Sequence, residues 1–355
     1  IDLASGIQAP FGRRPAFMAT RELVGPTASR LNCSNWATLD TIHYAEHLRA
    51  ILPRGCSHMY VTSSRDELVD KSLRCLRLSR PEGQYAIGLD GAYLGHITAA
   101  ARGLSDAAGF GEHFDLFGWP KLPHPALAGV DATVQALEAV LEERGANRAL
   151  ALVVEIVGER SGLVLGEEAI AALQRVCRKF DVPFVVSETT TGGYRNGQGA
   201  WAVDRLPESL VPDMVLWHPG GQLGHIFVGD RYWIGKPLTL ISTWDGDEIS
   251  MIRTHEALRA AWKVDMSASG EALGELALNI AEALGGKASG IGLARFVRCD
   301  PAKAKAFVEA AEREGVRFGT GAPGVIRLLP ALDIEADELR GEIEDVVAKV
   351  LEEVE

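Results

Sequence analysis

Long hydrophobic runs, repeats and cysteine motifs are missing from this sequence of 355 residues. No apolar run is long enough to span a bilayer, and neither a signal-peptide pattern nor a low-complexity tract is present. The five cysteines are odd in number and show no metal-ligand or redox spacing. We interpret them as buried thiols of a cytoplasmic protein and expect no membrane association.

Positive charge is also in short supply. The chain has 36 Lys and Arg residues against 48 Asp and Glu residues, which gives a net charge of −12. This balance argues against nucleic acid or an anionic membrane as a main partner. A hydrophobic content of 47% is typical of a globular chain, and the length suits one large domain plus a smaller one.

Apolar segments alternate with amphipathic segments through the middle of the chain. The apolar run at residues 149–156 predicts a central parallel strand, and residues 184–186 and 214–217 predict two further buried strands. Residues 130–145 and 167–180 have the spacing of amphipathic helices. The alternation predicts an α/β fold with a doubly wound, mainly parallel sheet.

Polar side chains follow the predicted strands, at the edge where open α/β sheets place their ligands. Glu155 ends the first strand, Ser187 and Glu188 end the second, and His218 ends the third. We interpret His218 and Glu188 as candidate general acids or bases. The spacing of His218 and His225 matches no tight ligand pattern, so we expect no metal site.

The stretch from Phe184 to His225 resembles the centre of class III (ω-type) aminotransferases, which are fold type I enzymes dependent on pyridoxal phosphate. In that family the first strand ends in D-E-x-x-T-G, and a later P-D-x-x-x-x-x-K supplies the Schiff-base lysine. Glu188, the Thr191-Gly192 step and Pro212-Asp213 match these motifs. The opening I-D-L-A-S-G-I is similar to a family motif that follows an N-terminal segment.

The resemblance extends over the whole chain and implies the domain organisation. It assigns residues 1–35 to an N-terminal segment of the small domain, 36–265 to the large α/β domain and 266–355 to a small α+β domain. Within the last region we expect a strand at 292–297 and a closing helix at 336–354.

The same stretch departs from the family where the cofactor is bound. Ser187 replaces the aspartate that pairs with the ring nitrogen, and the lysine position falls on Pro219, or on His218 if one gap is allowed. No lysine lies between Lys179 and Lys236. Because a serine cannot hold a proton on the ring by charge and neither replacement can form the imine, we expect a degenerate site and no cofactor.

A second departure falls on the segment that resembles the family's phosphate cradle. There the Gly-Ser pair becomes Arg65-Asp66, behind Ser64. Thr243 keeps the position of a family threonine that reaches the phosphate from the partner subunit, but Asp245 and Asp247 follow it. We expect these aspartates to repel an anion. An alternative is that Ser64 or Asp66 caps a helix and Arg65 is solvated.

Substrate-binding residues are better retained in this comparison. Tyr93 matches the family aromatic that stacks on the cofactor, Glu155 matches the glutamate of a V-E-P step, and Arg327 lies in an I-R-L-x-P step. In the family that arginine clamps a substrate carboxylate, a task that suits a forked guanidinium. The alternatives are that Tyr93 is a packing aromatic and that Arg327 is half of a structural ion pair.

These features lead to three hypotheses. The first is a repurposed enzyme that works without pyridoxal phosphate and binds a small carboxylate-bearing amino or keto acid in a cleft between the domains. The second is a non-catalytic subunit or regulator that pairs with an active homologue. The third is residual non-covalent binding of pyridoxal phosphate. For all three we expect a homodimer or a dimer with a homologue, as the resemblance implies.

Overall fold

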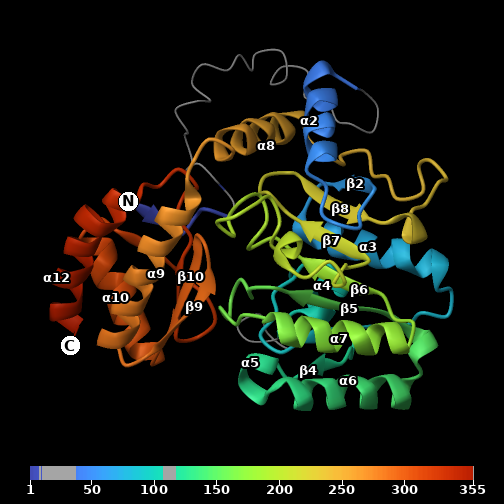
Figure 1. Ribbon diagram of the computed structural model, residues 1–355, viewed down its shortest axis with the longest axis horizontal. Coiled ribbons are helices and arrows are strands. Elements are labelled where there is room, and N and C mark those ends of the chain that lie inside the picture. The colour runs from blue at the N-terminus through green and yellow to red at the C-terminus, as the bar shows by residue number, and fades with distance from the viewer. Residues whose placement is uncertain (8, 10–36, 107–116, 355) are drawn as a thin grey trace.

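A computed structural model describes residues 1–7, 9, 37–106 and 117–354 of the chain. Two separate sheets organise these residues, and Figure 1 shows them side by side, with the N-terminal residues on the side of the smaller sheet. The predicted N-terminal segment therefore lies mostly outside the described residues. The predicted domain boundaries stay predictions.

The large sheet has seven strands in the order β2-β8-β7-β6-β5-β3-β4. Strands β3, β4, β5, β6 and β7 run parallel to one another, while β8 is antiparallel to both β7 and β2. The predicted α/β fold with a mainly parallel sheet is confirmed. Its strands are β2 (His58–Thr62), β3 (Tyr85–Leu89), β4 (Lys121–Leu122), β5 (Ala149–Glu155), β6 (Phe184–Ser187), β7 (Met214–Trp217) and β8 (Gly224–Val228).

Helices cover both faces of this sheet, which explains why its central strands are apolar throughout. All seven residues of β5 are buried, as a parallel strand between two helical layers requires. The helices are α2 (Leu39–Ala50), α3 (Arg65–Ser79), α4 (Ala99–Leu104), α5 (Pro125–Ala128), α6 (Val130–Arg144), α7 (Glu167–Lys179) and α8 (Glu248–Ala261). Short 3₁₀ turns are η3 (Ala146–Arg148), η4 (Ala202–Arg205) and η5 (Asp230–Tyr232).

The small sheet has five strands in the order β1-β11-β12-β10-β9 and is antiparallel except where β1 joins β11. It contains β1 (Asp2–Leu3), β9 (Lys287–Ile291), β10 (Ala294–Arg298), β11 (Arg317–Thr320) and β12 (Val325–Leu328). Its helical layer contains α9 (Met266–Ala283), α10 (Pro301–Arg313), α11 (Ala336–Glu338), the π-helical turn η6 (Leu339–Ile343) and α12 (Glu344–Val354).

The structure adds detail to one expectation about this region. The strand predicted at 292–297 is present as β10, the second arm of a hairpin, because Gly292 adopts a φ of 49° and turns the chain between β9 and β10. The segment that leads from the large sheet to the small sheet contains two helices, α8 and α9, and Asp265 caps the second by accepting the Ser267 N–H. The break at residues 262–265 thus falls between the two sheets (Figure 1).

The predicted burial of cysteines is confirmed for Cys56, Cys75 and Cys177, whereas Cys299 is partly exposed. Within the described ranges, no helix has both the length and the apolar character needed to cross a membrane.

Candidate functional site

The carboxyl ends of β5, β6 and β7 form one edge of the large sheet and face the small sheet across a cleft. Glu155 at the end of β5 is paired in register with Ser187 at the end of β6. Tyr93 follows β3, and Arg327 reaches the same place from β12 of the small sheet. A short parallel sheet thus gathers residues that are up to 234 positions apart, from Tyr93 to Arg327.

Glu159 lies at the centre of this cleft. Its Oε2 is 2.8 Å from a terminal guanidinium nitrogen of Arg65, and its Oε1 is 3.4 Å from one of Arg327. The side chain is 8% exposed, so both ion pairs are largely shielded from water. Sequence reasoning missed Glu159 as a site residue, although an acidic side chain four positions after the strand-end Glu155 was a usable signal.

Arginines surround that single carboxylate. Arg65 and Arg160 place their guanidinium carbons 5.0 Å and 5.4 Å from the ring centroid of Tyr93, within cation–π range. Burial lowers the pKa of Arg327; Glu159 opposes this shift, while Arg160 and Arg65 reinforce it. For Arg65, burial lowers the pKa, but Glu159, Tyr93 and Glu155 together more than offset it, so the pKa is raised. Arg327 is therefore the less compensated cation.

Glu155 binds the backbone of two residues of this site. Its carboxylate accepts the backbone N–H of Tyr93 at 2.8 Å and that of Glu159 at 3.2 Å. Burial raises the pKa of Glu155 to about 8 despite these hydrogen bonds. The Glu155 side chain is thus placed to position two site residues.

His218 lies beside the same charges, because Arg65 and Glu159 both influence its titration. Burial, then the charge of Arg65, lowers its pKa to about 4. Its Nδ1 lies 2.7 Å from the carbonyl oxygen of Leu223. Since a carbonyl only accepts, Nδ1 carries the proton and Nε2 keeps a lone pair.

Glu188 is not brought to the cleft. It is fully buried, its Oε1 accepts the Val203 N–H at 2.7 Å, and its Oε2 accepts the Thr191 hydroxyl. Both oxygens thus stabilise the loop after β6. This geometry gives no support to the predicted acid–base role of Glu188.

The residues predicted for a vestigial phosphate cradle are arranged differently from expectation. Ser64 caps α3 by accepting the Glu67 N–H, which confirms that alternative. The Asp66 carboxylate accepts the backbone N–H groups of His96, Ile97 and Thr98 at 2.7, 2.5 and 3.2 Å. Arg65 is buried and paired rather than solvated, so the alternative was wrong for this residue.

The two later aspartates also have partners within the protein. Asp245 forms a buried ion pair with Lys71, with Nζ 2.5 and 2.7 Å from its two oxygens. Asp247 caps α8 by accepting the Ser250 N–H at 2.9 Å. Thr243 is exposed on the loop that precedes that helix. Each of these aspartates thus has partners within the protein, and the expectation that Asp66, Asp245 and Asp247 repel an anion stays a prediction.

A cavity of about 250 Å³ opens beside Arg327. It is lined in part by Ser5, Glu159, Arg317, Gly319, Thr320 and Arg327. Within the described ranges, no cluster of three or more His, Cys, Asp or Glu side chains is arranged to hold a metal ion.

A sequence model of the aminotransferase class-III family matches residues 28–350. The chain belongs to the class III aminotransferase family. An L-lysine-ε aminotransferase of Amycolatopsis lactamdurans is 31% identical over 170 residues, which are 42% of this chain and 37% of that protein. A 4-aminobutyrate aminotransferase of Mycobacterium tuberculosis is 27% identical over 350 residues, which are 86% of this chain and 76% of that protein.

Solved structures of aminotransferases have the same fold. An ω-transaminase from Pseudomonas jessenii in complex with PMP superposes with a TM-score of 0.85 at 18% identity, over 98% of this chain and 87% of that chain. A lysine aminotransferase from M. tuberculosis superposes with a TM-score of 0.84 at 17% identity, over 99% and 89%. The predicted fold type I architecture is confirmed.

Family membership contradicts the prediction that no cofactor is used. Class III aminotransferases depend on pyridoxal phosphate, and this is the cofactor that membership indicates for the chain. The prediction failed partly because it counted charges along the sequence, whereas the carboxylates of Asp66 and Asp245 are occupied by backbone N–H groups and by Lys71.

The residues of the cleft fit this group in part, because Ser187 stands where the family has the aspartate that pairs with the ring nitrogen. The N-terminus of α3 provides backbone N–H groups for an anion, Tyr93 provides an aromatic face, and the buried Nε of Arg65 has no hydrogen-bond partner among the described residues. The sequence from residue 180 to residue 235 contains no lysine.

Proposed function

We propose that this class III aminotransferase-like protein acts on a small amino or keto acid whose carboxylate binds Arg327. The observation that carries the proposal is the charge balance of the cleft. Arg65 and Arg327 share the carboxylate of Glu159, and Arg160 lies over the Tyr93 ring beside them, while the raised pKa of Glu155 keeps it mostly protonated at pH 7. An anionic substrate restores the balance beside the cavity at Arg327.

Glu159 acts as the internal counter-ion in this proposal. While Glu159 contacts Arg327, the guanidinium has a partner and its burial is partly compensated. A substrate carboxylate takes over that contact, and Arg65 retains Glu159 at the shorter distance of 2.8 Å. The site therefore binds a carboxylate without leaving a buried charge unpaired.

We further propose that the chain holds pyridoxal phosphate without a covalent bond. Arg65 and the α3 N-terminus would hold the phosphate, and Tyr93 would contact the ring. When bound, this group supplies an electron sink for reactions at the α-carbon of an amino acid. His218 is neutral at pH 7, and its Nε2 lone pair can take a proton from that carbon.

Reduction with borohydride tests the absence of a covalent link. The protein is equilibrated with pyridoxal phosphate, reduced, digested and analysed by mass spectrometry, while a parallel sample is dialysed. We expect saturable binding that dialysis reverses, and no modified peptide at substoichiometric cofactor. A stoichiometric adduct on one lysine, or no binding at millimolar cofactor, would contradict this part of the proposal.

The substrate site has its own test. Succinate serves as an inert carboxylate, and its affinity is measured by calorimetry for the unaltered chain and for Arg327→Lys. A lysine keeps the charge but loses the forked geometry, so we expect affinity to fall about tenfold, or about 1.4 kcal/mol. Arg317→Lys, on the outer side of the same cavity, is the matched control.

A non-catalytic subunit remains the second candidate, and the missing lysine is the observation that favours it. Cofactor and succinate binding without any exchange of amino-acid α-protons would favour this reading. For both candidates we propose a homodimer, because the loop from η5 to α8 exposes Leu238, Ile241 and Trp244. Light scattering coupled to size-exclusion chromatography measures the assembly.

A further inference from the structure

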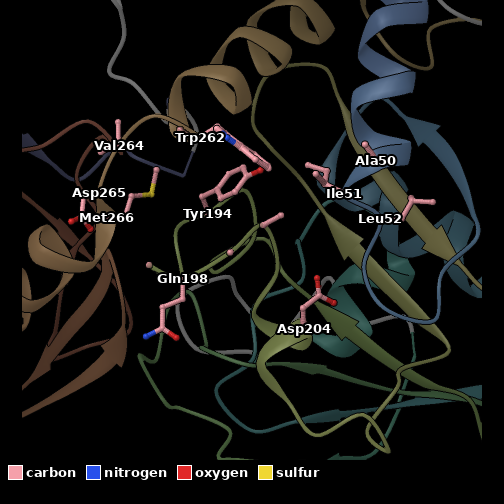
Figure 2. Close-up of a pocket in the computed structure, with 14 residues that line it drawn as sticks. Ala50, Ile51, Leu52, Tyr194, Gln198, Asp204, Trp262, Val264, Asp265 and Met266 are labelled. Carbon is pink, nitrogen blue, oxygen red and sulfur yellow. The ribbon is translucent and has the colours of Figure 1, made fainter.

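A second cavity, of about 570 Å³, lies between the two sheets and away from Glu159 and Arg327. Ala50 to Leu52, from the end of α2 and the turn after it, form one wall. The loop around Tyr194 forms another, and the connection between α8 and α9 completes it. Figure 2 shows Tyr194 beside Trp262, with Ile51 across the cavity from them. Its volume is within the range of small-molecule sites.

Backbone strain is concentrated in the wall that Tyr194 supplies. Tyr194 has a φ of 74°, a left-handed conformation that costs an aromatic residue free energy. The next residue, Arg195, is fully buried and donates hydrogen bonds to the carbonyls of Gly6 and Pro330 at 2.7 and 2.8 Å. The anchored arginine fixes the strained residue, and so the ring faces Trp262 at a centroid distance of 6.3 Å.

One polar group of this cavity stands out, and the charged side chains that line it are both acidic. The Tyr194 hydroxyl is buried and has no hydrogen-bond partner among the residues that the structure describes, while the Trp262 side chain is 71% exposed. Of the described residues that line the cavity, the two with a formal charge are Asp204 and Asp265. Asp265 also caps α9.

Asp204 is the deeper of the two acids. One of its carboxylate oxygens accepts the Arg54 N–H at 2.8 Å. The Arg54 guanidinium turns away to the backbone carbonyls of Leu206 and Asp204. Burial raises the pKa of the Asp204 carboxyl, against the effects of Arg54. The second oxygen can therefore accept an interaction with a bound cation.

We infer that this cavity binds an organic cation with an apolar or aromatic body. Two aromatic rings and two carboxylates, in a wall formed by Ile51, Leu52 and Met266, match the two ends of such a molecule. The ligand contacts the α8–α9 connection, which joins the two sheets, and the Tyr194 loop, which lies between β6 and β7 of the large sheet. The site is separate from the proposed carboxylate site and does not depend on it.

Benzyltrimethylammonium is the probe, since its fixed charge cannot serve as an amino donor. Binding is followed by saturation-transfer NMR and titration calorimetry with the full chain. Its uncharged isostere, neopentylbenzene, reports the apolar contribution alone. We expect the cation to bind at least fivefold more tightly than the isostere, with saturating succinate leaving its affinity unchanged.

Two variants and one control locate the site. Asp204→Asn keeps the acceptor for the Arg54 N–H but removes the charge, and Trp262→Ala removes an exposed ring with little effect on folding. We expect each to weaken cation binding at least fivefold, whereas Asp131→Asn on α6 leaves it unchanged. No binding by the unaltered chain at millimolar concentration, equal binding of the isostere, or an unaltered affinity in either folded variant would overturn the inference. If Asp204→Asn does not fold, Trp262→Ala and the isostere decide the result.

Discussion

Arg65 holds Glu159 more closely than Arg327 does, at 2.8 Å against 3.4 Å. Arg65 stands at the first position of α3, in a segment that resembles a family phosphate cradle, and Arg327 arrives from the small sheet. One carboxylate thus links the start of a helix in the large domain to a strand of the small domain. Removing the Glu159 carboxylate therefore changes substrate affinity and the free energy of unfolding in different ways.

We predict that Glu159→Gln tightens succinate binding about tenfold, because the amide no longer competes as an anion for Arg327. The same change costs about 3–5 kcal/mol of unfolding free energy, since it leaves buried guanidinium groups without their counter-ion. Calorimetry gives the affinity and urea denaturation gives the stability.

Glu275→Gln is the control, because it breaks an exposed ion pair with Arg340. We expect that variant to leave both quantities unchanged. Weaker succinate binding by Glu159→Gln would show that Glu159 helps to hold the substrate rather than competing with it.

The titration of Glu155 leads us to predict that stability depends on pH. Burial raises its folded-state pKa to about 8 from an ordinary value of 4.5, so the native state binds more protons than the unfolded state between these values. The unfolding free energy therefore falls as pH rises through this window. His218 and His225, with pKa values lowered by burial to about 4 and about 3, act oppositely below pH 6.5.

Between pH 7 and 8 the effect of Glu155 is least obscured, and we expect a loss of about 1 kcal/mol. Glu155→Gln should flatten this slope, because the amide does not titrate. Urea denaturation at several pH values measures it. An identical slope in Glu155→Gln would show that other groups cause the pH dependence.

The central strands were predictable because a strand that is buried on both faces is apolar at almost every position. The run Ala149–Glu155 is apolar at every position up to its last, and helix α7, which follows it in the chain, has clear amphipathic spacing. The I-R-L-x-P step was also recognisable, and the structure places its arginine, Arg327, on strand β12. Local pattern and motif sufficed for these elements.

Partners that come from distant segments were not predictable in the same way. Nothing near Asp245 in sequence indicates that Lys71, 174 positions earlier, neutralises it. Asp66 likewise finds its N–H donors at residues 96–98. Counting charges along the sequence without these partners contributed to the mistaken expectation that no cofactor is used.

The Lys71–Asp245 pair itself allows a stability prediction. Their side chains are 7% and 3% exposed, so removing one partner leaves a buried charge. We expect Lys71→Met to cost about 3–5 kcal/mol of unfolding free energy, and Asp245→Asn a similar amount. The double variant should recover part of the loss, because the amide and the thioether that replace the ion pair are uncharged and no buried charge is left without a partner.

A double-mutant cycle in urea provides the measurement. Strictly additive losses in the double variant would show that the two side chains stabilise the fold independently, despite the short distance between them.

His218 is the side chain on which the proposed chemistry depends. Its Nδ1–H is committed to the Leu223 carbonyl, so Nε2 is the available base. His218→Asn can preserve that hydrogen bond but has no basic nitrogen. We expect α-proton exchange of an amino acid, supplied with pyridoxal phosphate in D₂O and followed by NMR, to slow by about 10²–10⁴-fold. Succinate affinity and the urea midpoint should remain unchanged, which separates a lost base from a damaged site. Because the pKa of His218 is about 4, exchange by the unaltered chain should stay constant down to that pH and fall below it. An exchange rate within twofold of the unaltered chain would assign the proton transfer to another group and leave His218 a packing residue.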